Sequence, residues 1–104
     1  MTQPVHLETL REITNGDPEL ERELFALFFQ TIEACLARMA AAAGAMEWSE
    51  SAHEMKGAAA NIGAPALVEL CLLAEKAGEE RQRLLAQLAE EYARVKAFLQ
   101  TEQP

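Results

Sequence analysis

The chain has 104 residues, of which 50% are hydrophobic, and its formal net charge is -8. This length fits one compact domain over residues 1–104 that can bury a core without disulfides or metals. The negative charge argues against nucleic acid or an anionic membrane surface as a partner, because both require clustered lysine and arginine. Abundant alanine, leucine and glutamate, with little glycine and proline, favour an all-α fold.

The N-terminus does not carry the basic region, apolar core and small-residue cleavage site of a signal peptide. No run approaches the ~18 consecutive apolar residues of a membrane span. We therefore expect a cytoplasmic protein.

Two helices are predicted before residue 44. Apolar residues from Val5 to Ile13 indicate a short helix that ends at Asn15-Gly16. Asp17-Pro18 then predicts an N-cap followed by proline at the first helical position. The long helix that starts there carries apolar residues at helical spacing: Leu20, Leu24, Leu27, Phe28, Ile32, Cys35 and Met39. It is expected to end in the alanine run before Gly44.

Phe25, Phe29 and Leu36 widen this apolar stripe to roughly half of the helix circumference. A helix that faces a core needs an apolar face of only about 100°. Part of the apolar edge is therefore expected to stay exposed. The sequence does not decide whether Phe25 or Phe29 lies there, and burial of both is the favoured interpretation.

A third helix is predicted with two distinct faces. Its core stripe is Trp48, Ala52, Met55, Ala59 and Ile62. His53 lies about 100° around the helix from Ala52, beside the core stripe. Its own face has small neighbours: Ser49, Lys56, Gly57, Ala60 and, in the next turn, Ala64. The opposite flank holds Glu47, Glu50, Glu54 and Asn61.

Two further helices complete the predicted fold. Gly63 can end one helix and Pro65 can begin the next. That helix has an apolar stripe from Leu67 to Ala77 and is closed by Gly78. The final helix, over 79–100, carries Leu85, Leu88, Tyr92, Val95 and Leu99 at bundle spacing. We predict an antiparallel up-down-up-down four-helix bundle with a short additional N-terminal helix.

The face around His53 carries the residues best suited to chemistry. A neutral imidazole is a nucleophile, and the ammonium of Lys56, one turn away, attracts anions. A phosphoryl group on His53 would bring its oxygens within reach of Lys56. Gly57 costs about 1 kcal/mol relative to alanine inside a helix, so it needs a local reason. Clearance for a docking partner is one reason, and a helix-packing contact is the alternative.

These residues resemble the histidine-containing phosphotransfer (HPt) domains of bacterial and lower-eukaryotic phosphorelays. The similar stretch is residues 52–75, AHEMKGAAANIGAPALVELCLLAE. The family pattern is Ala-His-x-Leu-Lys-Gly, a run of small residues, Gly, and Leu-x-x-Leu-Cys with a carboxamide or carboxylate after it. The resemblance implies that His53 is the phosphoacceptor, that Lys56 assists at the phosphoryl group and that Gly57 permits close docking.

The family also places Gln or Glu beside the imidazole, and Glu75 matches this position. Its carboxylate could accept a hydrogen bond from Nδ1–H and leave Nε2 free to attack. A solvated surface glutamate is the alternative. The sequence departs from the family in Met55, where leucine is usual, and in Ala74, where leucine often precedes the acidic residue. The small Ala74 leaves the placement of Glu75 open.

The resemblance implies a stand-alone phosphotransfer intermediate of a multistep His-Asp relay. Its partners would be response-regulator receiver domains and a hybrid sensor histidine kinase, with Mg²⁺ on the receiver and no cofactor on this chain. A monomer is expected. Alternatives are a domain labelled directly by a separate chemotaxis-type kinase and a catalytically idle bundle that binds receivers. The sequence has no Gly-rich phosphate loop, Walker motif or kinase signature, so we expect no ATP-dependent kinase activity.

The cysteines and the second histidine are not expected to take part. Cys35 and Cys71 lie in apolar helical patterns without a CxxC pair, which favours small buried thiols over a disulfide or metal site. His6 is interpreted as a surface residue. No HxxxH or inward-facing ExxH pair is present, so we expect no metal site.

Overall fold

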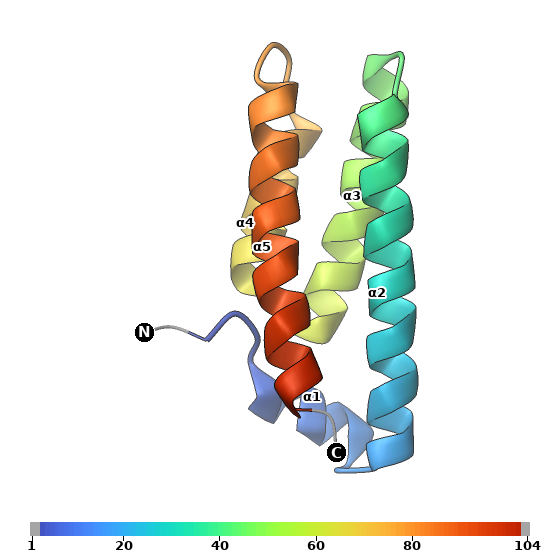
Figure 1. The fold of residues 1–104 in the computed structure, drawn as a ribbon, viewed down its shortest axis with the longest axis vertical. Coiled ribbons are helices and arrows are strands. Elements are labelled where there is room, and N and C mark those ends of the chain that lie inside the picture. The colour runs from blue at the N-terminus through green and yellow to red at the C-terminus, as the bar shows by residue number, and fades with distance from the viewer. Residues whose placement is uncertain (1–2, 103–104) are drawn as a thin grey trace.

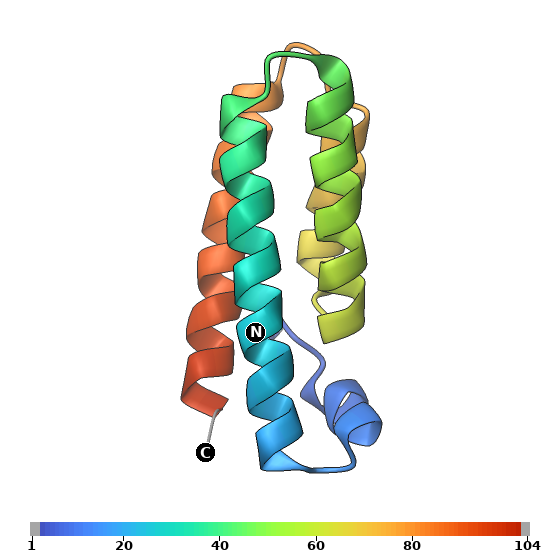
Figure 2. The same cartoon turned by 90° about the vertical axis from the view of Figure 1, so that its right-hand side faces the viewer.

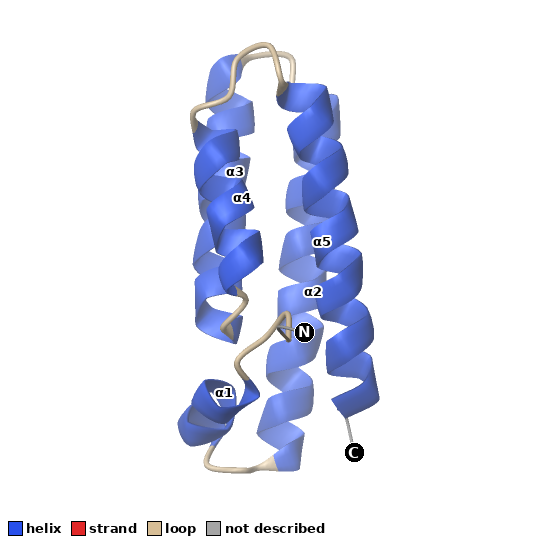
Figure 3. Ribbon diagram, turned by 90° about the vertical axis from the view of Figure 1, so that its left-hand side faces the viewer, coloured by secondary structure: helices blue, strands red, loops and turns tan. Residues whose placement is uncertain are grey.

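The computed structural model describes residues 3–102, and this part of the chain contains helices and no strand (Figures 1 and 3). The helices are α1 (Leu7–Thr14), α2 (Pro18–Ala41), α3 (Ala45–Ile62), α4 (Pro65–Glu75) and α5 (Arg81–Glu102). The prediction of an all-helical fold is confirmed.

The four longer helices lie along the long axis of the molecule, and α1 lies at one end (Figure 1). Helix α3 packs against α2 and α4, and α5 packs against α2 and α4. In Figure 2 the chain rises through α2 and returns through α3 beside it. Because α3 and α4 are joined by residues 63–64 alone, the surface between these two helices is built from one continuous hairpin.

The helix boundaries follow the capping signals in the sequence. The carboxylate of Asp17 accepts hydrogen bonds from the backbone N–H groups of Glu19 and Leu20, at 3.0 and 3.4 Å. Gly63, with φ of 82°, ends α3, and Pro65 begins α4. The predicted cap, end and start are therefore confirmed.

The turn between the last two helices is longer than predicted. Helix α4 ends at Glu75, although the apolar stripe continues to Ala77, because Lys76 already leaves helical geometry with φ of -101° and ψ of 0°. Helix α5 begins at Arg81, two residues after the predicted start at 79. The end of α4 therefore places Glu75 in its last turn.

The core resolves the open question about α2. Phe25 is fully buried, and Phe29 is half-buried against α5, where its ring centre lies 6.4 Å from that of Tyr92. Neither phenylalanine supplies the exposed edge. Leu20 and Leu27 supply it instead, with exposed fractions of 38% and 59%. Leu27 lines a groove between α2 and α3, where Gly57 and Ala58 are small.

The cysteines are free and buried, as predicted. Burial raises the pKa of the Cys71 thiol to about 12 and also raises the pKa of Cys35. Both thiols are therefore protonated at neutral pH and serve as small core residues. Among the described residues, no group of three or more histidine, cysteine, aspartate or glutamate side chains is placed to hold a metal ion.

Helix α2 is long and apolar enough, by length and composition, to cross a membrane. The same helix contributes Phe25, Phe28, Ile32, Cys35 and Met39 to the core. A core helix of a bundle passes the same test of length and hydropathy, so this property is weak evidence for a membrane location.

We predict that Trp48→Phe lowers the free energy of unfolding by about 0.5 to 1.5 kcal/mol, because the Ala74 carbonyl loses the indole donor and keeps only the bond from the Ala77 N–H. In the structure, the indole N–H of Trp48 donates to the carbonyl of Ala74 at 2.7 Å. Urea unfolding followed by circular dichroism measures the change. As a control, Met46→Leu replaces a side chain that is 73% exposed and is expected to change stability by less than about 0.5 kcal/mol. Equal stability of Trp48→Phe and the parent would contradict this role.

Candidate functional site

His53 stands on the outer surface of α3, beside the core stripe of that helix. The neighbouring Ala52 and Met55 are fully buried, whereas 71% of the His53 side chain is exposed. The exposure differs because successive residues of a helix point about 100° away from each other, so His53 lies outside the buried stripe. The imidazole is thus held by a rigid helix and remains open to a partner.

Glu75 from α4 brings the predicted site residues together. Its Oε1 lies 2.9 Å from Nζ of Lys56 and 3.4 Å from Nδ1 of His53. The Lys56 and Glu75 side chains are 24% and 21% exposed, so this pair is partly shielded from water. The structure therefore places three of the four predicted site residues in one cluster, and their roles remain predictions.

Two hydrogen bonds fix the position of Glu75 relative to α3. The Trp48 indole donates to the carbonyl of Ala74, and the Ser49 hydroxyl donates to the carbonyl of Glu75 at 3.4 Å. Both bonds hold the last turn of α4 against the first turns of α3. The small Ala74, which left the placement of Glu75 open, is fully buried beneath this contact.

The charges in the cluster are arranged so that Glu75 is ionised. The hydrogen bond from the Lys56 ammonium is the main cause that lowers the pKa of Glu75, while burial opposes it and His53 adds a smaller lowering effect. A carboxylate facing Nδ1 favours the imidazole tautomer with its proton on Nδ1. The lone pair of Nε2 then points away from α4, and Nε2 is the ring nitrogen available to an electrophile.

Gly57 has no packing role within the described part of the chain. A Cβ atom added at this position would meet no other atom within 4 Å, apart from its own helix. The helix-packing alternative for this glycine is therefore not supported. The missing side chain instead leaves open space one turn from His53, next to a groove between α2 and α3.

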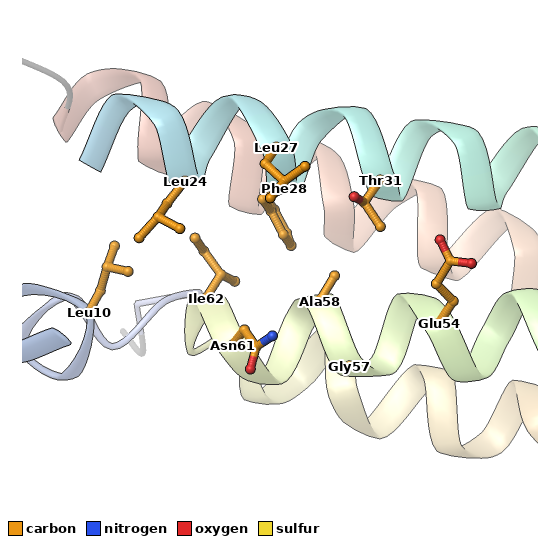
Figure 4. A pocket seen from close by; sticks show the side chains of 10 residues that line it. All are labelled: Leu10, Leu24, Leu27, Phe28, Thr31, Glu54, Gly57, Ala58, Asn61 and Ile62. Atoms are coloured by element: carbon orange, nitrogen blue, oxygen red, sulfur yellow. The ribbon is translucent and has the colours of Figure 1, made fainter. Parts of the chain in front are cut away.

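This groove is mainly apolar and has a volume of about 340 Å³. In Figure 4, side chains from α2 and α3 face each other across it, and Leu10 of α1 lies at one end. Its lining residues are Leu10, Leu24, Leu27, Phe28, Thr31, Glu54, Gly57, Ala58, Asn61 and Ile62. Leu27, predicted in the apolar stripe of the long helix, is exposed, whereas Leu24 is partly buried against the core. The excess width of that stripe was the sequence signal for an exposed edge. Ala64, in contrast, is 1% exposed and does not border His53 on the surface.

Comparison with known families places this cluster in context. The model of the Hpt domain family matches residues 23–98. The chain belongs to the Hpt domain family. Members of this family carry out histidine phosphotransfer in phosphorelay signalling. No curated protein and no solved structure matches the chain.

The Hpt match spans the whole cluster, from His53 on α3 to Glu75 on α4. It begins at residue 23, so α1 and the first turn of α2 lie outside it. Leu10 on α1 nevertheless lines the groove beside Gly57. The surface near the candidate phosphoacceptor therefore combines the matched region with a helix that the match does not include.

We predict that Gly57→Ala stabilises this Hpt domain by about 1 kcal/mol, because alanine has the higher helix propensity and its Cβ meets no neighbour. Urea unfolding measures the gain. Gly63→Ala provides the contrast, since Gly63 has φ of 82° and an added Cβ would lie 3.5 Å from the carbonyl oxygen of His6. That variant is expected to lose stability. A destabilised Gly57→Ala protein would show that Gly57 has a packing role.

Proposed function

We propose that the protein is a phosphotransfer intermediate of a multistep His-Asp phosphorelay. His53 accepts a phosphoryl group from the aspartyl phosphate of one receiver domain and passes it to another. The observation that carries this proposal is an exposed imidazole whose Nδ1 faces a carboxylate, with an ammonium one turn away and open space at Gly57. We further propose that α2 to α5 form an antiparallel up-down-up-down bundle that holds this surface rigid.

The transfer step needs little chemistry from this chain. The lone pair of Nε2 forms a bond to phosphorus while the bond from phosphorus to the aspartate oxygen breaks, and the electron pair leaves with the aspartate carboxylate. The proton on Nδ1 stays in place, facing Glu75. Lys56 stabilises the phosphoryl oxygens, and Mg²⁺ held by the receiver neutralises charge on the partner side. Reversal of the same step delivers the group to the second receiver.

The groove between α2 and α3 is the proposed contact surface for the receiver. It lies beside Gly57, and Leu27 exposes an apolar side chain there. Burial of this apolar surface supplies binding free energy and excludes water from the transferred group. Because Gly57 has no side chain, the partner can approach α3 closely beside this groove.

The partners in this proposal are response-regulator receiver domains and a hybrid sensor histidine kinase. The protein works in the cytoplasm, as a monomer and without a cofactor of its own. Its net charge of -8 supports partners other than nucleic acid. ATP is used by the kinase, because this sequence has no phosphate-binding loop of its own.

Experiments can distinguish two alternative functions from this proposal. In the first, a separate chemotaxis-type kinase transfers phosphate from ATP directly to His53. In the second, the bundle binds receivers without accepting phosphate. The ammonium and carboxylate placed around the imidazole favour a phosphoacceptor over an idle bundle.

We predict that a phosphorylated receiver labels the parent protein and that His53→Gln abolishes the labelling, because no other exposed imidazole has the same surroundings. The label should be acid-labile and stable in alkali, as expected for phosphohistidine. His6→Gln is the matched control and should be labelled like the parent. Undiminished labelling of His53→Gln would refute the assignment, and labelling by a kinase and ATP alone would support the first alternative.

We predict that Leu27→Asp reduces kcat/KM for transfer from a receiver by about tenfold, equivalent to about 1.4 kcal/mol, because it places a charge in the apolar groove. Labelling by phosphoramidate, a small phosphodonor that needs no docking surface, should not change. Leu73→Asp is the matched control, since Leu73 is 58% exposed and Leu27 is 59% exposed, and Leu73 does not line the groove. Equal losses for both variants would remove the groove from the proposed contact surface.

A further inference from the structure

The Lys56 ammonium is already paired with Glu75 in this structure. Its ammonium lies 2.9 Å from Oε1 of Glu75, an oxygen that is buried. Three-quarters of the Lys56 side chain is covered, whereas His53 is mostly exposed. The ammonium is therefore paired with a carboxylate of α4.

The position of Nε2 decides where a transferred phosphoryl group would lie relative to the Lys56–Glu75 pair. The same Oε1 lies 3.4 Å from Nδ1 of His53. Nε2 is separated from Nδ1 by Cε1, and its lone pair diverges in the ring plane from the Nδ1–H bond, so the lone pair is directed away from Glu75. A phosphoryl group on Nε2 would stand outside the Lys56–Glu75 pair, toward solvent and the partner.

We propose that phosphorylation of His53 exchanges the main partner of Glu75: Lys56 leaves the carboxylate for the phosphoryl oxygens, and the Nδ1–H of the phosphorylated ring, which already lies near Oε1 at 3.4 Å, becomes the partner of the carboxylate. This inference rests on the proposed function and adds a change of state at the same site. Glu75 is then a positioning residue that binds the Lys56 ammonium in the unphosphorylated protein. It touches the reacting ring but not the transferred group.

The charges balance in both states. Before transfer, the negative Glu75 is paired with the positive Lys56, and the imidazole is neutral. When the lone pair of Nε2 bonds to phosphorus and Nδ1 keeps its proton, the ring gains positive charge while the aspartate carboxylate departs with its electron pair. Glu75 then faces a positive ring, and Lys56 faces a phosphoryl group. Each charged group therefore has an oppositely charged neighbour at both stages.

The exchange is favoured by the chemistry of the two anions. A phosphoryl group carries up to two negative charges near neutral pH and has three acceptor oxygens, whereas the carboxylate carries one charge. Lysine has a flexible four-carbon stem, so its ammonium can move without movement of the helix. The resting pair is partly exposed to water, so breaking it is inexpensive.

Nuclear magnetic resonance of the lysine ammonium groups tests the exchange directly. The chain has three lysines, Lys56, Lys76 and Lys96, so the ¹⁵Nζ spectrum is simple, and Lys56→Gln identifies the signal of Lys56. Glu75→Gln should shift this signal in the unphosphorylated protein. In protein labelled with phosphoramidate, the same substitution should leave the signal nearly unchanged. Glu69→Gln, an exposed position on α4, is the matched control and should have no effect in either state.

An equal shift of the Lys56 signal in both states would overturn the exchange, because the Lys56–Glu75 pair would then persist. A protein that neither phosphoramidate nor a receiver can label would instead refute the proposed function itself.

Discussion

The contact between the start of α3 and the end of α4 is the constraint on which the site depends. The Trp48 indole and the Ser49 hydroxyl donate to consecutive backbone carbonyls at the end of α4. These bonds set the register of the two helices, and the register places the Glu75 carboxylate between Lys56 and His53. A slip of one residue would rotate Glu75 by about 100° and separate the three side chains. Packing in the α3–α4 hairpin is thus directly coupled to the orientation of the imidazole.

The two flanks of α3, one toward α4 and one toward α2, differ in character. Toward α4 the helix presents Lys56, which takes part in an ion pair, whereas toward α2 it presents Gly57 and Ala58, which line the groove. His53 stands between these flanks. In the proposed function, the polar flank orients the ring, and the apolar flank offers surface that a protein partner can bury. One helix thus presents the imidazole between an ion pair on one side and a groove on the other.

The sequence predicted the elements well, because capping signals are local. Asp17, Gly63 and Pro65 set helix ends through their own backbone and side-chain geometry, and no distant contact is needed to interpret them. The cluster around His53 could be anticipated from the spacing within α3 and from the family resemblance for Glu75. The groove could not, because exposure of Leu27 depends on how short the facing side chains of α3 are. Pairing of Lys56 with Glu75 likewise depends on the α3–α4 register, which spacing along one helix does not contain.

In the proposed function, the electrostatics of the surface around His53 make phosphotransfer depend on the partner. Lys56 is the one basic residue in the α3 sequence, which also carries Glu47, Glu50 and Glu54. Arg38 of α2 lies 3.0 Å from Glu54 and offsets its charge, but Glu75 already holds Lys56. An incoming phosphoryl group therefore meets a surface with little free positive charge. In the proposed function, most of the charge stabilisation in the transition state would then come from the metal and cationic groups of the receiver, and phosphotransfer would be efficient only in the complex.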